Sequence, residues 1–159
     1  MSATQERSGT DEVLEGGAVA VWNGDLMSGT GSLRFELGAG GELPLLWPGS
    51  STHGLGATTP EELASAAHAA CFTMTLAHTL ARGRHIPRKI VTEAKTNFGV
   101  VADVRMIRRS QLEITVDADK LSGAELDRAA ELAGRYCPVS NTLRAAGVAL
   151  DVRARLAAE

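Results

Sequence analysis

Two thiols are the side chains with the most distinctive chemistry in this sequence. Cys71 and Cys137 are its only cysteines. Cys137 precedes Pro138 at a predicted helix start, where the helix dipole and unpaired N–H groups stabilise a thiolate, although such a cysteine can also serve only as a cap. Cys71 lies inside AAHAACFTMT, where a helical cysteine is usually a small buried apolar residue. Because they are distant in sequence, only the fold decides whether the thiols meet.

Two carboxylates, Glu61 and Glu62, stand at the start of the predicted helix that contains Cys71. Glu62 stands three residues after Thr59 and completes a capping box, whereas Glu61 has no structural role beyond a favourable interaction with the helix dipole. Glu61 precedes Cys71 by ten residues, or about 15 Å along a straight helix. The two cannot touch within one helix. If two copies of the helix pack antiparallel, Glu61 of one copy can approach Cys71 of the other.

Metal and nucleotide sites find little support. His68 and His78 flank Cys71 on roughly one helical face, so a zinc site with Cys137 is conceivable. No closely spaced CxxC or HExxH pattern accompanies them, and satisfied core or interface histidines fit better. The Gly-rich segments GTGS and GAGG follow no phosphate-binding motif.

Composition limits the class of protein. Of the 159 residues, 44% are hydrophobic and 22% charged, which fits a soluble globular protein. A net charge of -3 gives no general attraction for nucleic acid or an anionic membrane. The most apolar stretch, residues 63–81, is too polar for a bilayer span. Two cysteines and an N-terminus without an apolar signal core favour a reducing cytoplasm.

The pattern predicts a loose tail at residues 1–14 and one α+β domain at 15–159. Its order is βββ-α-ββ-α-α-β. Alternating apolar residues indicate the strands, while Ser, Thr, Cys and Pro at helix starts and Gly at their ends indicate the helices. The strands are expected at 18–23, 32–37, 42–47, 89–98, 104–118 and 148–156, and the helices at 60–81, 122–135 and 138–146.

The helix at 60–81 has small or apolar residues on nearly every face. Such a helix is expected to be buried all round. One chain of this size supplies that cover with difficulty, so the folded unit is expected to contain two chains.

Three motifs together resemble the OsmC/Ohr family. The segment TTPEELASAAHAACFTMTLAHTL is similar to the family's helix start and its AAHAACF-like cysteine. Residues 22–26, WNGDL, resemble the first strand and turn of the OsmC branch, and residues 137–140, CPVS, resemble its second-cysteine motif. The resemblance runs from about residue 18 to residue 156.

This resemblance implies a homodimer in which curved antiparallel sheets wrap central cysteine-bearing helices. It also implies a thiol peroxidase for organic hydroperoxides, and more weakly hydrogen peroxide, in oxidative or osmotic stress defence. Cys71 would become a sulfenic acid, and Cys137 would form a disulfide with it. A dithiol, such as a lipoyl group on a carrier protein, would reduce that bond. No metal, flavin or haem is implied.

One departure concerns the family's arginine, which is held by the glutamate matched here by Glu61. Residues 35–59 contain no Lys or Arg, and His53 is the one potentially cationic side chain among them. Arg34 is the nearest upstream arginine. Either one of these or another arginine takes the role, or the thiolate is less activated and turnover is slow. The alternative function is therefore a catalytically weak homodimer that senses oxidants or binds an apolar ligand, followed by a stress-protective dimer with idle thiols.

Overall fold

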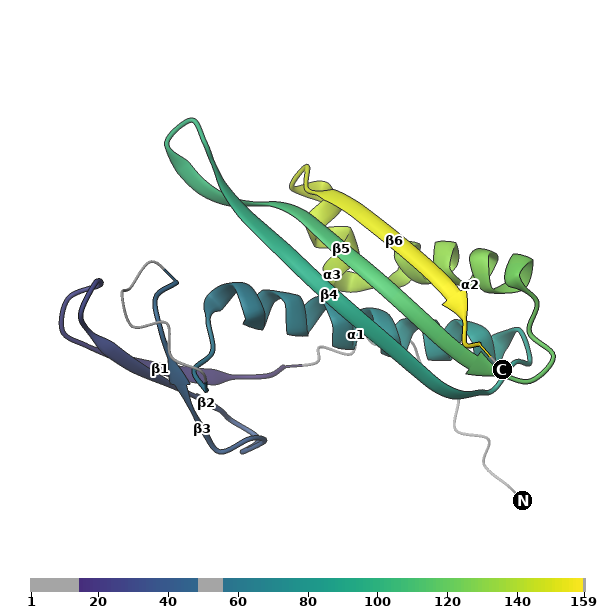
Figure 1. Cartoon of the computed structure of the whole chain (residues 1–159), viewed down its shortest axis with the longest axis horizontal. Coiled ribbons are helices and arrows are strands. Elements are labelled where there is room, and N and C mark those ends of the chain that lie inside the picture. The colour runs from purple at the N-terminus through teal and green to yellow at the C-terminus, as the bar shows by residue number, and fades with distance from the viewer. Residues whose placement is uncertain (1–14, 49–55, 159) are drawn as a thin grey trace, which may run out of the picture. The chain divides into compact units, whose positions relative to one another are not determined.

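The computed structural model describes residues 15–48 and 56–158 (Figure 1). These fall into two compact units that divide between Thr59 and Pro60. The predicted α+β class and element order are confirmed, while the predicted tail at 1–14 lies outside the described residues. The first unit contains β1 (Ala18–Asn23), β2 (Thr30–Phe35) and β3 (Glu42–Leu45). The second contains α1 (Pro60–Arg82), β4 (Pro87–Val101), β5 (Val104–Ala118), α2 (Gly123–Tyr136), α3 (Pro138–Ala145) and β6 (Ala149–Leu156).

The first unit is an antiparallel sheet in the order β1-β2-β3. Its WNGDL motif builds the turn between β1 and β2. Gly24 has a φ of 92°, a backbone conformation that residues other than glycine rarely adopt. The Asp25 carboxylate accepts hydrogen bonds from the backbone N–H groups of Met27 and Ser28, at 2.9 and 3.0 Å. These bonds stabilise the turn, so the motif has a structural purpose of its own.

Strand β2 begins and ends two residues earlier than the sequence pattern indicates. The chain leaves the strand after Phe35, whose carbonyl accepts a hydrogen bond from Gly38 N–H at 3.0 Å. Gly38 has a φ of 75°. This turn takes residues 36 and 37 out of the sheet, although their side chains continue the alternation.

The second unit has a three-stranded sheet with its helices on one face (Figure 1). Strands β4 and β5 form a long antiparallel hairpin of 15 residues each. Strand β6 pairs parallel to β5, from Arg109–Ala149 to Val116–Leu156. The expectation of purely antiparallel sheets is therefore wrong for this unit. Helices α2 and α3 carry the chain back from the end of β5 to its middle, and such a crossover makes the next strand parallel.

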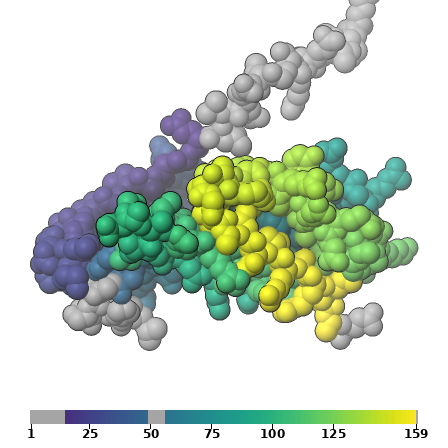
Figure 2. Space-filling model, turned by 90° about the horizontal axis from the view of Figure 1, so that it is seen from above, coloured from purple at the N-terminus to yellow at the C-terminus, as the bar shows by residue number. Residues whose placement is uncertain are grey.

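Strand β6 forms an edge of this sheet, and its atoms lie open on the face shown in Figure 2. The core lies between the sheet and the helices. Leu112, Ile114 and Val116 alternate along β5 and are almost fully buried against the helices.

Helix α1 buries one stripe, with residues spaced by four: His68, Phe72, Leu76 and Leu80. Met74, on another face, is 67% exposed. The described residues of one chain therefore cover this helix only in part, and its burial on every side stays a prediction for a two-chain unit. One sheet face and two short helices can cover only part of a helix of 23 residues.

Candidate active site

The fold brings the two thiols together. Cys71 lies in the middle of α1 and Cys137 stands at the start of α3, with the two Sγ atoms 3.3 Å apart. Both cysteines are free thiols. At this distance the sulfurs are in contact, and a modest approach would reach the disulfide bond length of about 2.05 Å.

The junction of α2 and α3 fixes Cys137. Its backbone N–H donates to the carbonyl of Ala133 at 2.8 Å, which ends α2. Its sulfur accepts the N–H of Ser140 at 3.5 Å, and Pro138 occupies the first turn of α3. The predicted N-cap is confirmed. Cys137 has no exposed surface, so solvent reaches Cys71 before it reaches Cys137.

Cys71 is half-buried, and its environment controls how readily it ionises. Burial raises the pKa of the Cys71 thiol, and the adjacent Cys137 raises it further. The Val139 N–H and the Thr75 hydroxyl act in the opposite direction by hydrogen bonding. Since the pKa stays raised overall, the protonated thiol is favoured at neutral pH within one chain.

His68 lies one turn before Cys71 and has no exposed surface. Its Nδ1 lies 2.7 Å from the hydroxyl of Ser110, and its Nε2 lies 2.8 Å from the hydroxyl of Ser140. Burial lowers the pKa of His68, so the imidazole is neutral. The interpretation as a satisfied core histidine is confirmed.

The zinc alternative does not assemble. Both ring nitrogens of His68 are engaged by serines, and His78 is exposed on the helix surface. Across residues 15–48 and 56–158, no group of three or more His, Cys, Asp or Glu side chains could hold a metal ion.

Glu61 borders a cleft of about 450 Å³ between the start of α1 and the middle of β4. Its Oε2 atom and the Thr96 hydroxyl, both in this cleft, are buried and have no hydrogen-bond partner among the described residues. An unpaired buried carboxylate is costly, so this site suits a cation or other donor. Glu61 is ten residues from Cys71 on one continuous helix, and the chain does not bring them together.

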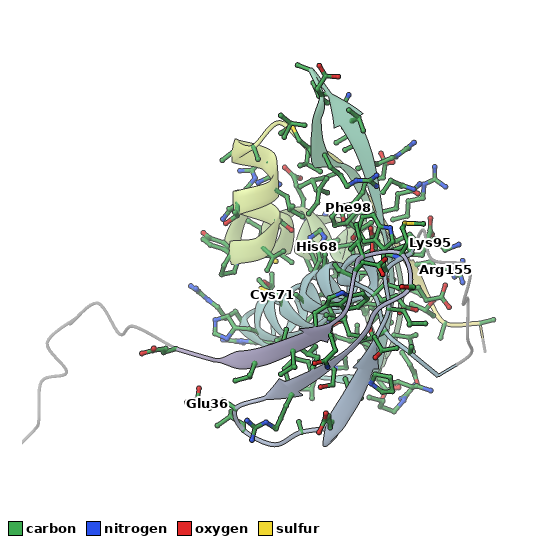
Figure 3. All side chains as sticks on the ribbon, turned by 90° about the vertical axis from the view of Figure 1, so that its left-hand side faces the viewer. Glu36, His68, Cys71, Lys95, Phe98 and Arg155 are labelled. Carbon is green, nitrogen blue, oxygen red and sulfur yellow. The ribbon has the colours of Figure 1, made fainter. Side chains whose placement is uncertain are left out.

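The sequence offers two candidates for this cation, His53 and Arg34. His53 is outside the described residues. Arg34 is in β2 of the first unit, where it pairs in register with Val19 and Glu42. Lys95, labelled in Figure 3, is a further cationic residue that the sequence did not single out. It borders the Glu61 cleft, but its side chain is exposed and alternates with the inward Ala94 and Thr96.

A second feature that the sequence did not indicate is a groove of about 850 Å³ along α1 and α2. Thr75, which bonds to Cys71, forms part of its wall. Three apolar side chains in the groove are exposed: Met74, Leu132 and Tyr136. The pattern could not reveal it because the two helices are far apart in the sequence.

Residues 51–153 match the family model described as OsmC-like protein. The chain belongs to the OsmC-like family. It is 34% identical over 128 residues to Peroxiredoxin OsmC of Escherichia coli (strain K12), which covers 79% of this chain and 87% of the relative. The resemblance that the three motifs indicated is therefore confirmed.

Solved OsmC-like structures share the fold. The OsmC-like protein from Mycoplasma pneumoniae aligns with a TM-score of 0.73 at 16% identity, covering 94% of this chain and 100% of its own. The organic hydroperoxide resistance protein OhrB of Bacillus subtilis aligns with a TM-score of 0.67 at 20% identity, covering 89% and 98%. In the part of the chain that the structure describes, no helix has the length and hydropathy needed to cross a membrane.

Proposed function

We propose that this OsmC-like protein is a thiol peroxidase that reduces organic hydroperoxides, and hydrogen peroxide more weakly, in oxidative or osmotic stress defence. The observation that carries the proposal is the 3.3 Å contact between a half-buried thiol and a buried one, on separate helices. The kinship with a peroxiredoxin supports it.

In the first step, the Cys71 thiolate attacks the terminal oxygen of the hydroperoxide. A sulfur–oxygen bond forms and the oxygen–oxygen bond breaks, so the peroxide gains two electrons. The alkoxide takes up a proton and leaves as an alcohol, and Cys71 is left as a sulfenic acid. Cys71 carries out this step because it is the more accessible of the two thiols.

In the second step, the sulfur of Cys137 attacks the sulfenic sulfur of Cys71. The disulfide forms, the sulfur–oxygen bond breaks, and hydroxide leaves as water with the proton of Cys137. An external dithiol then returns two electrons and two protons to the pair. A lipoyl group on a carrier protein has this chemistry, and a reducing cytoplasm would maintain it. The cycle needs no metal or prosthetic group.

Activation of Cys71 requires help, because burial raises the pKa of its thiol. We propose a homodimer in which two α1 helices pack antiparallel and Glu61 of the partner subunit approaches Cys71. The unpaired Oε2 of Glu61 would hold a cationic side chain near the thiolate. The exposed Met74 and the groove beside it support burial of this face by a second copy. A stable, fully active monomer in analytical ultracentrifugation would contradict the dimer.

The function is tested with reduced protein and stoichiometric cumene hydroperoxide. Peroxide loss and the state of each thiol are followed by mass spectrometry in the parent, Cys71→Ser and Cys137→Ser. We expect a Cys71–Cys137 disulfide in the parent and a sulfenic or overoxidised Cys71 in Cys137→Ser. Peroxide loss in the parent no faster than in Cys71→Ser would rule out the enzyme.

The source of the cation is tested by separate substitutions. His53→Gln, Arg34→Gln and Lys95→Gln each remove one candidate and leave an uncharged polar side chain in its place. The variant that loses Cys71 oxidation without losing dimerisation identifies the group. Thiolate absorbance near 240 nm during a pH titration measures whether that variant has a less acidic Cys71.

A second candidate function is an OsmC-like homodimer that senses oxidants or binds an apolar ligand without efficient turnover. The absence of Lys and Arg from residues 35–59, together with the raised pKa of Cys71, favours it. It predicts slow disulfide formation with peroxide and no sustained turnover when a dithiol is supplied in excess. Sustained turnover contradicts it.

A further inference from the structure

A buried imidazole joins three elements beside the thiol pair. His68 on α1 bonds Ser110 on β5 through one ring nitrogen and Ser140 on α3 through the other, at 2.7 and 2.8 Å. Phe72 packs against the ring edge-to-face, with 6.4 Å between ring centroids. The ring is therefore held on both polar edges and by a neighbouring aromatic side chain. Figure 3 labels His68 and Cys71 on α1.

Ser140 connects this imidazole to the sulfurs. Its hydroxyl bonds His68, while its backbone N–H donates to Cys137 Sγ at 3.5 Å. Cys137 Sγ in turn contacts Cys71 Sγ. His68 and Cys71 are one turn apart on α1. Helix α1 thus contacts the start of α3 at two adjacent points, one polar and one through sulfur.

Burial makes the polar contact hard to break. A neutral imidazole has one donor and one acceptor, and each serine hydroxyl can supply either complement. Ser110 and Ser140 have almost no exposed surface. If α3 moved away from α1, His68 and Ser140 would lose a hydrogen bond where water does not replace it, which is unfavourable. Separation of Cys137 from Cys71 is opposed for the same reason.

We propose that His68 is a positioning residue for the thiol pair: through Ser140 it holds the first turn of α3 so that Cys137 stays in contact with Cys71. It raises the effective concentration of one thiol at the other and so favours the disulfide over the separated thiols. This inference rests on the proposed function, in which the two cysteines form that disulfide. His68 acts through Ser140 and does not touch the hydroperoxide.

The test omits peroxide. The full-length protein is equilibrated with mixtures of oxidised and reduced dithiothreitol. The two protein thiols lose two electrons and two protons as their sulfurs bond, and the cyclic disulfide of the reagent opens to its dithiol. The fraction of protein disulfide, counted by mass spectrometry after alkylation, gives an equilibrium constant that reports thiol proximity.

Ser140→Ala and His68→Leu are compared with Thr73→Val. Thr73 also lies on α1, and its hydroxyl donates to Thr92 on β4 at 2.7 Å, away from α3. We expect the equilibrium constant to fall about fivefold in Ser140→Ala, the effect of losing one buried hydrogen bond. Thr73→Val is expected to stay within about twofold of the parent, since its bond does not reach α3.

The equilibrium constant of the double variant His68→Leu/Ser140→Ala is expected to be no lower than that of the more affected single variant, because the two residues act through one bond. Thermal unfolding of each variant separates misfolding from a shifted equilibrium, and Ser140→Ala decides the result if His68→Leu does not fold. Unchanged equilibrium constants in folded Ser140→Ala and His68→Leu, or an equal fall in Thr73→Val, would overturn the proposal. Failure of the proposed function would be seen in a separate experiment, the peroxide assay, in which Cys71 would remain unoxidised.

Discussion

At the residue scale, neighbouring side chains near the start of α3 are buried for different reasons. Cys137 has no exposed surface, and in the proposed cycle this burial would keep the peroxide away from the second thiol until Cys71 is oxidised. His68 is buried as a neutral, fully bonded ring. Cys71 alone of the three retains exposed surface. In the proposed cycle, accessibility rather than intrinsic acidity assigns the first chemical step to Cys71.

The burial of His68 gives folding stability a pH dependence. Its pKa is lowered from 6.5 in the folded state, so the unfolded chain binds a proton more readily. The free energy of unfolding should be highest above about pH 6.5 and fall as pH decreases, by at most about 1.4 kcal/mol per pH unit. Urea unfolding between pH 5 and 8 measures this slope.

Two variants identify the residue responsible. His68→Leu should lose the slope between pH 5 and 6.5, whereas His78→Gln, which removes an exposed histidine from the same helix, should keep it. A His68→Leu protein with the parent's slope would show that another group causes the pH dependence.

At the element scale, the position of the thiol pair depends on how α2 begins and on how its end connects to the start of α3. The Ser122 hydroxyl accepts the N–H of Glu125, and the Glu125 carboxylate accepts the N–H of Ser122 at 2.8 Å. At the other end, Cys137 closes α2 and opens α3. Because the second thiol stands at this junction, the geometry of the pair depends on the position of α2.

Removing the cap should destabilise the protein. Ser122→Ala is expected to lower the free energy of unfolding by about 1 kcal/mol, because an N–H at the start of α2 loses its acceptor. Chemical denaturation measures the change. Ser122→Asp keeps an acceptor and should retain most of the stability, so an equal loss in both variants would contradict the capping explanation.

Gly134 offers a stabilising change in the same helix. A methyl group at this position would lie 3.9 Å from Phe72, an ordinary contact, and alanine favours the helix. Gly134→Ala should therefore raise the free energy of unfolding by about 0.5–1 kcal/mol. Gly31→Ala in β2 is the contrast, since its methyl would lie 2.6 Å from the Trp22 ring. That variant should lower stability and change tryptophan fluorescence, and a destabilised Gly134→Ala would contradict the packing argument.

At the scale of the whole molecule, the second unit leaves a face of its central helix without cover. Met74 is 67% exposed, as is Tyr136 across the groove from it. Exposed apolar side chains gathered in one groove are typical of an interface. One carboxylate oxygen of Glu61 is also buried and finds no partner among the described residues. Both features are explained by the proposed homodimer.

Met74→Glu should weaken self-association, because a carboxylate would be buried in the proposed interface without a partner. Sedimentation velocity over a range of protein concentrations is expected to show a dimer for the parent and a larger monomer fraction for the variant. Leu37→Glu, at an apolar residue that is 91% exposed in the first unit, is the matched control and should sediment like the parent. A monomeric parent would contradict the proposal at once.

The sequence by itself determined the features that depend on residues close together in the chain. The bounds of α1, the caps at Ser122 and Cys137, and the order of the elements follow from short-range hydrogen bonding and side-chain periodicity. The cysteine motifs also sufficed to indicate the family. Where local rules failed, as at residues 36 and 37, a turn overrode an alternation that was continuous in the sequence.

Only the tertiary structure decided what depends on chain segments that are distant in sequence. It placed the Cys71 and Cys137 sulfurs 3.3 Å apart and gave His68 its two serine partners. It also made β6 parallel to β5 and left one face of α1 exposed. These outcomes follow from how two helices cross back over a sheet and how much apolar surface one chain can bury, and no local pattern encodes either quantity.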